Sequence, residues 1–118
     1  MELLMFQLRI YTLKDDKTAS LYMNEYWQRH LISLPKYGIK VEGVFKEKSK
    51  SSDQPCRVFA IVSFSKGVDA QASNQKYMDS PEFKSDMDGF PMENILNVES
   101  LDLARNEKLP FFDGLEAK

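Results

Sequence analysis

The sequence predicts an α+β domain in which six elements follow the order β-α-β-β-α-β and four strands form an antiparallel sheet. Three observations support this fold class. Apolar and polar residues alternate with a period of two in several short segments, which is typical of strands with one buried face. Two longer segments with helical start and stop signals separate the strands where this order requires them. The chain has 118 residues, 42% of them hydrophobic, which suits one domain with its own core.

The first strand is expected at residues 4–13, where apolar and polar side chains occupy alternate positions. The polar segment that follows offers Asp16 or Thr18 as the residue that caps a helix. This first helix is expected to extend to Gly38, since glycine readily adopts the left-handed conformation that ends a helix. Pro35 favours an earlier end of the regular α-helical part.

The remaining elements follow from the same kinds of signal. Apolar and polar residues alternate again at residues 39–48, which predicts a second strand with one solvent-exposed face. Residues 57–64 predict a third strand that is apolar on both faces. A second helical region at residues 65–87 is interrupted at Ser80, because a serine followed by proline is typical of a new helix start. Residues 95–103 predict the fourth strand.

This order is the ferredoxin-like plan, in which two helices cover one face of a four-stranded antiparallel sheet. The first and third strands are then central, and the second and fourth lie at the edges, which agrees with their higher charge. We expect the domain to span residues 1–104. Residues 105–118 are expected to form a tail that docks on the domain or on a dimer partner, since Phe111 and Phe112 need an apolar contact.

The apolar third strand implies a partner for the face of the sheet that has no helices. Phe59 and Ile61 alternate with Val58 and Val62, so one of these pairs points away from the helices. Leaving such residues in water costs roughly 1.5–3 kcal/mol for each large side chain. We therefore predict a homodimer in which two sheets pack face to face as a closed or nearly closed barrel. The alternative is that the tail folds back over the bare face.

Composition excludes several classes of protein. The formal net charge of −2 lacks the basic excess of a nucleic-acid binder. Cys56 is the only cysteine, which rules out an internal disulfide. No apolar run is long enough to span a bilayer, and no glycine-rich phosphate loop is present. We expect a cytoplasmic protein with no bound metal and no cofactor; Asp86 and Asp88 are interpreted as solvated residues near a helix end.

The candidate site centres on His30, the only histidine, which falls on the apolar side of the first helix. A buried imidazole needs hydrogen-bond partners, and Tyr26, four residues earlier, is within reach. The candidate proton carriers are His30, Tyr26 and Tyr11, because a histidine pKa lies near neutrality. The candidate ligand-binding residues are Trp27, Met23, Arg9 and Gln7. The alternative is an ordinary core histidine beside a packed tryptophan.

This site depends on which row of the first strand faces the helices, and both assignments remain open. In one, the polar row lies under the helices and the apolar row joins the dimer interface; in the other, the two are exchanged. The polar row consists of Gln7, Arg9 and Tyr11, and the apolar row of Phe6, Leu8 and Ile10.

The chain resembles the dimeric α/β-barrel superfamily, and within it the NIPSNAP-like proteins. The resemblance is carried by "LRIYTLK" before the first helix, "YWQRHLISLPKYGIKVEGVF" from that helix into the second strand, and "YMDSPEFKSDM" in the second helical region. It extends over about residues 5–103. The resemblance implies a ligand pocket between helices and sheet in each subunit, but it supplies no catalytic residues.

Three functions follow as hypotheses. The first is a homodimer that binds a small, mostly apolar molecule between helices and sheet. The second is a cofactor-independent oxygenase or isomerase that acts on an aromatic substrate, with His30 and Tyr26 or Tyr11 as its reactive groups. The third is a structural or partner-binding dimer with a filled interior. Haem ligation by His30 is conceivable, but a single histidine supports it weakly. A cavity beside His30 would distinguish the first two from the third.

Overall fold

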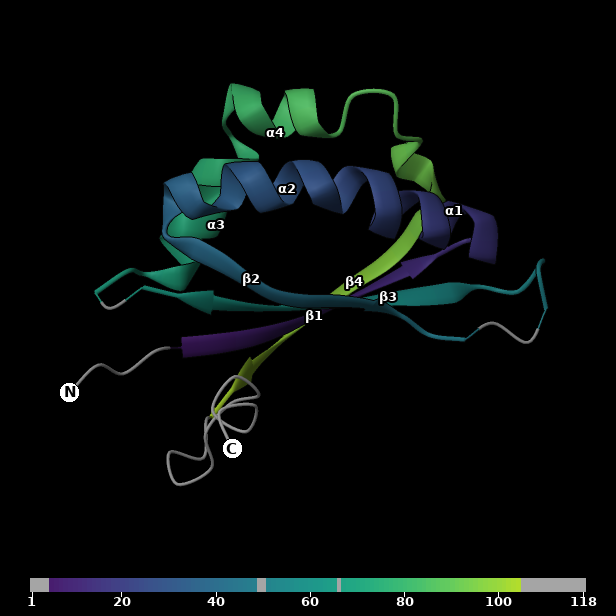
Figure 1. Ribbon diagram of the computed structural model, residues 1–118, viewed down its shortest axis with the longest axis horizontal. Helices are drawn as coiled ribbons and strands as arrows, with labels where there is room; N and C mark the ends of the chain where they lie inside the picture. The colour runs from purple at the N-terminus through teal and green to yellow at the C-terminus, as the bar shows by residue number, and fades with distance from the viewer. Residues whose placement is uncertain (1–4, 49–50, 66, 105–118) are drawn as a thin grey trace, which may run out of the picture.

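A computed structural model describes residues 5–48, 51–65 and 67–104 of the chain. Its helices lie together on one side of a four-stranded sheet, and the other side of the sheet carries none of them (Figure 1). The α+β ferredoxin-like fold predicted from the sequence is therefore confirmed. The strands are β1 (Met5–Leu13), β2 (Ile39–Lys46), β3 (Cys56–Phe64) and β4 (Ile95–Leu103). The α-helices are α1 (Asp16–Leu21), α2 (Trp27–Ser33), α3 (Ala70–Met78) and α4 (Pro81–Asp86).

The sheet has the strand order β2-β3-β1-β4, with every neighbouring pair antiparallel. The central positions of β1 and β3 match the prediction, and so do the edge positions of β2 and β4. The helices leave β4 largely uncovered, since eight of its nine residues are exposed. The edge of the sheet is consequently open on the side of the helices as well as on the opposite side.

The first helical region contains one irregular turn that sequence periodicity does not reveal. Asp15 caps α1 by accepting a hydrogen bond from the backbone N–H of Thr18. A π-helical turn, η1 (Tyr22–Tyr26), connects α1 to α2, and a 3₁₀ turn, η2 (Leu34–Tyr37), ends at Gly38 with φ 78°. The region ends at the predicted glycine, and its regular α-helical part ends earlier, as expected from Pro35.

The π turn changes which side chains are buried. Its wider i→i+5 hydrogen bonding rotates the following residues relative to a regular α-helix. Leu31, which a regular helix would place on the apolar side, is 49% exposed. Trp27 and His30 are buried, as helical periodicity also predicts, and they face the sheet.

The second helical region is interrupted where the sequence indicates. Asp69 caps α3, and Ser80 caps α4 by accepting a hydrogen bond from the backbone N–H of Phe83. The Ser80 hydroxyl also donates to the carbonyl of Tyr77, so it holds the end of α3 to the start of α4. This link orients α4 against α2, on the side of α2 away from the sheet (Figure 1).

The two faces of the sheet have different compositions. On the helix-covered face, Tyr11 lies opposite Val58, Arg9 opposite Ala60 and Gln7 opposite Val62, and the three β3 residues are fully buried. The polar row of β1 therefore faces the helices, which settles the assignment that the sequence left open. The opposite, helix-free face carries the apolar row of β1 and its cross-strand neighbours. Its apolar residues are Phe6, Leu8, Ile10, Phe45, Phe59, Ile61, Leu101 and Leu103.

The predicted docking of the tail lies outside the described residues, because Phe111 and Phe112 belong to residues 105–118.

Candidate functional site

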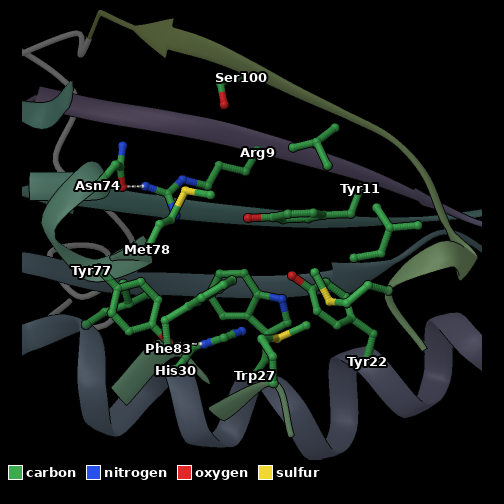
Figure 2. A pocket seen from close by; sticks show the side chains of 15 residues that line it. Arg9, Tyr11, Tyr22, Trp27, His30, Asn74, Tyr77, Met78, Phe83 and Ser100 are labelled. Atoms are coloured by element: carbon green, nitrogen blue, oxygen red, sulfur yellow. Dashed lines mark hydrogen bonds between the residues drawn. The ribbon is translucent and has the colours of Figure 1, made fainter. Parts of the chain in front are cut away.

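A cavity of about 260 Å³ lies on the helix-covered face, between the helices and the β1–β4 part of the sheet (Figure 2). Most of its surface is apolar and comes from aromatic, methionine and aliphatic side chains. We call it the aromatic cavity. Its lining residues are Arg9, Tyr11, Tyr22, Trp27, His30, Leu34, Asn74, Tyr77, Met78, Phe83, Met87, Met92, Ile95, Val98 and Ser100.

Three aromatic rings, from β1, the π turn η1 and α2, form one wall of the cavity. The ring centroids of Tyr11 and Tyr22 are 5.2 Å apart, and Trp27 lies 6.0 Å from Tyr11 and 6.2 Å from Tyr22. All three pairs meet edge to face, the arrangement that aromatic quadrupoles favour. Burial, and then the neighbouring Tyr11, raise the pKa of the Tyr22 phenol well above its ordinary value. This wall is therefore uncharged at neutral pH on the side of Tyr22.

The indole N–H of Trp27 is a buried donor beside the Tyr22 hydroxyl. Trp27 is only 2% exposed, and its Nε1 is covered from solvent and makes no close hydrogen bond to the described residues. Figure 2 shows this nitrogen on the same side of the ring as the Tyr22 hydroxyl. Burial raises the pKa of Tyr22, whereas Trp27 as a hydrogen-bond donor lowers it, which identifies the Tyr22 oxygen as the group that this N–H faces.

His30 belongs to a buried chain of three polar groups. Its Nδ1 lies 2.6 Å from the Tyr77 hydroxyl oxygen, and that hydroxyl is 2.5 Å from Oδ2 of Asp86. The phenol has one proton, which it donates to the carboxylate, so the Tyr77 oxygen accepts a hydrogen bond from His30 Nδ1–H. The imidazole is then neutral with its proton on Nδ1, and its Nε2 makes no hydrogen bond to the described residues.

Burial holds His30 in this neutral form. It lowers the pKa of the imidazole to about 4; the charge of Asp86 opposes this, whereas Arg9 and Arg29 add to it. Burial and the hydrogen bond to Asp86 raise the pKa of Tyr77. The pKa near neutrality expected from the sequence is therefore not found, because desolvation outweighs the nearby carboxylate.

Arg9 projects from β1 at one end of the cavity. Its Nε donates to Oε1 of Gln7 at 3.0 Å, and its Nη2 donates to Oδ1 of Asn74 on α3 (Figure 2). Gln7 in turn donates from Nε2 to Asp102 on β4 at 3.1 Å. A second, polar hollow lies beyond this network and shares Asn74 with the aromatic cavity. The Arg9–Asn74 bond thus lies at the boundary between the two spaces.

Four of the seven residues predicted from the sequence line the aromatic cavity: Arg9, Tyr11, Trp27 and His30. Gln7 lines the polar hollow next to it.

Two predicted residues, Tyr26 and Met23, line neither the aromatic cavity nor the polar hollow. Tyr26 packs its ring on Phe90 and donates its hydroxyl hydrogen bond to the carbonyl of Asp88 at 3.2 Å. The predicted contact between Tyr26 and His30 is not formed, and Tyr77 partners the imidazole instead. Met23 packs against the hydrophobic core and is not among the lining residues.

Sequence reasoning missed most of the other residues of the site, and three of them are central to its polar groups and aromatic wall: Tyr22, Tyr77 and Asp86. Tyr22 reaches the cavity through the π turn, for which the sequence gives no clear signal. Tyr77 comes from α3, 47 positions after its partner His30. The interpretation of Asp86 as solvated was wrong, because it is buried and accepts the hydrogen bond from Tyr77. Its burial follows from α4 packing on α2.

Other chemistry finds little support in the described residues. No group of three or more His, Cys, Asp or Glu side chains in them has the geometry of a metal site. Cys56 is buried, and desolvation raises the pKa of its thiol, which disfavours the nucleophilic thiolate. None of the helices described is both long and apolar enough to cross a membrane.

The sequence matches no protein-family model and no curated protein. Solved structures match the fold closely. A NIPSNAP-like domain protein from Burkholderia xenovorans superposes with a TM-score of 0.67 at 13% identity, covering 93% of this chain and 91% of its own. The chain has the NIPSNAP fold. A NIPSNAP family protein from Agrobacterium tumefaciens agrees, with a TM-score of 0.65 at 15% identity and coverage of 92% and 99%.

The resemblance identified from the sequence is thus matched in structure over more than nine-tenths of the chain. A third structure, described as a dimeric ferredoxin-like protein from an uncultured marine organism, has a TM-score of 0.54 at 8% identity. It covers 87% of this chain and 97% of its own. These superpositions establish the shared fold. At such low sequence identities, any function has to be argued from the side chains of this chain.

Proposed function

We propose that the protein binds a small, mostly apolar molecule with one ring in the aromatic cavity. The observation that carries this proposal is a partly open space of about 260 Å³ with aromatic walls and few polar groups in its lining. Small-ligand sites are usually apolar with a few polar groups that fix the orientation of the ligand. The volume lies just below the roughly 300–1,000 Å³ of pockets for drug-sized molecules, which suits a single substituted ring.

We also propose that the working unit is a homodimer formed through the helix-free face. Phe45 is 56% exposed there, Leu101 52% and Leu103 38%. They adjoin the half-buried Ile61 and Leu8 across the strands, so the exposed apolar surface crosses all four strands. A contiguous patch of this kind is typical of an interface. A second copy is the natural occupant, since sheets of this kind can pack face to face about a two-fold axis.

A second candidate is a cofactor-independent oxygenase or isomerase. The observation that favours it is the neutral His30, which lines the cavity with an Nε2 that no described residue uses. With a pKa of about 4 the imidazole is a weak base, so it would suit only a substrate whose own proton is acidic. A His30→Ala variant that folds and retains turnover of a substrate would remove this candidate. The third function considered, a dimer with a filled interior, agrees poorly with the cavity.

The binding proposal is tested by blocking the cavity. We suggest a thermal-shift screen of one-ring compounds against the wild-type protein and Val98→Trp, since Val98 lines the cavity and is exposed on β4. Leu96→Trp is the matched control, because Leu96 is equally exposed on the same strand but does not line the cavity. A ligand present at 100 times its Kd raises the free energy of unfolding by about 2.7 kcal/mol.

We expect ligands that raise the melting temperature of the wild-type protein and of Leu96→Trp but not that of Val98→Trp. Equal shifts in both variants would place binding elsewhere. The absence of any shift across a broad panel of one-ring compounds would count against the proposal as a whole.

A further inference from the structure

We propose that the ligand is a small aromatic carboxylic acid whose carboxylate binds Arg9 while its ring fills the aromatic cavity. This inference rests on the proposed binding function and adds the chemical class of the ligand. It starts from an imbalance of charge at the end of the cavity where β1 meets α3.

Both hydrogen-bond partners of Arg9 are neutral amides. Its Nε donates to the side-chain carbonyl of Gln7 and its Nη2 to that of Asn74. A guanidinium carries five N–H donors, and these bonds use two of them. Within the described residues, no ion pair joins Arg9 to a carboxylate. Its positive charge and most of its donors therefore have no partner in the part of the chain that the structure describes.

The two carboxylates of the neighbouring polar hollow are engaged elsewhere. Asp102 accepts a hydrogen bond from Gln7 Nε2. Asp69 caps α3 by accepting from the backbone N–H groups of Gln71 and Ala72. Gln7 thus stands between Arg9 and Asp102, with its carbonyl oxygen directed at the cation and its amide nitrogen at the carboxylate.

A half-buried cation beside an apolar cavity is costly without a counter-ion, because little water solvates it. A carboxylate supplies that counter-ion in the geometry that the guanidinium fork favours, with two parallel charge-assisted hydrogen bonds. The charge of Arg9 acts inside the cavity, since it contributes to the lowered pKa of His30. A bound anion would relieve this imbalance where the protein does not.

The opposite part of the cavity determines the rest of the ligand. Aromatic rings and methionine side chains line the space below Arg9 in Figure 2. A ring fits among them. An acid such as 4-hydroxyphenylacetate has a ring for this apolar space and a carboxylate that can reach Arg9.

The test uses three probes that share a 4-hydroxyphenyl ring and carry an anionic, a neutral and a cationic end group: 4-hydroxyphenylacetate, its amide and tyramine. Their affinities are measured by isothermal titration calorimetry at pH 7 for the wild-type protein, Arg9→Gln and Arg9→Lys. Lys84→Gln is the control, since it removes the same charge from an exposed position on α4 that does not line the cavity. Melting curves of the free variants establish that each is folded.

We expect the wild-type protein to bind the acid at least tenfold more tightly than the amide and to bind tyramine weakest. Arg9→Gln should abolish the preference for the acid, Arg9→Lys should keep part of it, and Lys84→Gln should keep all of it. An acid that binds no better than the amide to the wild-type protein overturns the inference, and so does a preference that survives in Arg9→Gln. In both cases the binding proposal stands if the amide binds. If none of the three binds, the inference fails; the binding proposal fails with it only if the wider panel also gives no shift.

Discussion

The two faces of the sheet treat polar and apolar groups in opposite ways. Under the helices, the side chains of His30 and Tyr77 are buried and hydrogen-bonded to each other, and the half-buried Arg9 lines the same cavity. On the helix-free face, large apolar side chains such as Phe45 and Leu101 remain more than half exposed. Each face is incomplete in its own way, because one holds a cation with no carboxylate partner among the described residues and the other exposes apolar side chains.

This difference separates two roles that one sheet performs. Polar atoms that lack a full set of protein partners, in a confined and mostly apolar cavity, select for a small complementary molecule. Only matched hydrogen bonds offset the desolvation of such atoms. Exposed apolar area selects for a large flat partner, since burial scales with area and needs no matching groups. The alternation of β1, in which successive side chains point to opposite faces, puts both properties on the same few residues.

The largest expected effect concerns the helix-free face. Phe45→Glu should prevent the proposed dimer, because each copy would lose the burial of a phenylalanine and gain a buried charge. The loss of burial alone is about 3–6 kcal/mol per dimer, so the dissociation constant should rise at least about 100-fold. Sedimentation velocity across a concentration series measures this change.

Ile32→Glu is the matched control for this substitution. Ile32 is the most exposed large apolar residue of α2, on the side of the sheet where the helices lie. It should leave the oligomeric state unchanged. A wild-type protein that sediments as a monomer at all concentrations would contradict the dimer proposal directly.

The next effect concerns the helix-covered face and depends on pH. The pKa of His30 is about 4 in the folded protein and near 6.5 in an unfolded chain. Above pH 6.5 the imidazole is neutral in both states. As the pH falls from 6.5 to 4, the unfolded state takes up the proton first, so the folded state loses stability, by about 3 kcal/mol at the end of this range.

His30→Ala removes this dependence. Urea unfolding at pH 7, 6, 5 and 4.5 should show the wild-type advantage over His30→Ala shrinking steadily as the pH falls, with the carboxylates common to both proteins cancelling. An advantage that stays constant across these values would mean that the imidazole is not held neutral by burial.

The smallest expected effect compares two tyrosines. Tyr77→Phe removes the hydroxyl between His30 and Asp86 and leaves two buried groups without that partner, which should cost about 1–3 kcal/mol. Tyr26→Phe removes one hydrogen bond to the carbonyl of Asp88 next to solvent, and should cost about 0.5–1.5 kcal/mol. Chemical denaturation of both variants measures the difference in the free energy of unfolding. Equal losses would mean that the buried His30–Tyr77–Asp86 hydrogen bonds stabilise the fold no more than the single bond of Tyr26 does.

Most of the fold was predictable because its signals are local. The alternation of β1 and β4, the break at Ser80 and the closing Gly38 each depend on a few neighbouring residues, and each lies where the sequence predicts. The apolar third strand also indicated correctly that the sheet has two apolar faces. Which row of β1 faces the helices was not predictable, because both rows contain residues that can be buried.

The site was predictable only in part, because its partners come from distant segments. Helical periodicity directed His30 and Trp27 toward the sheet, as found. It also proposed Tyr26 as the partner of His30 from a regular wheel, whereas the contact comes from Tyr77 on another helix. Asp86 was interpreted as solvated because it lies near a helix end, and the packing of α4 on α2 buries it.

The π turn at Tyr22–Tyr26 has a consequence for how the cavity tolerates change. The turn contains one residue more than a regular α-helix accommodates, and it separates Tyr22 from Trp27, which both form the aromatic wall. In a regular α-helix, residues five apart point about 140° away from each other, whereas the wider π turn keeps Tyr22 and Trp27 on the same side. The shape of the cavity therefore depends on this irregular turn as much as on side-chain identity.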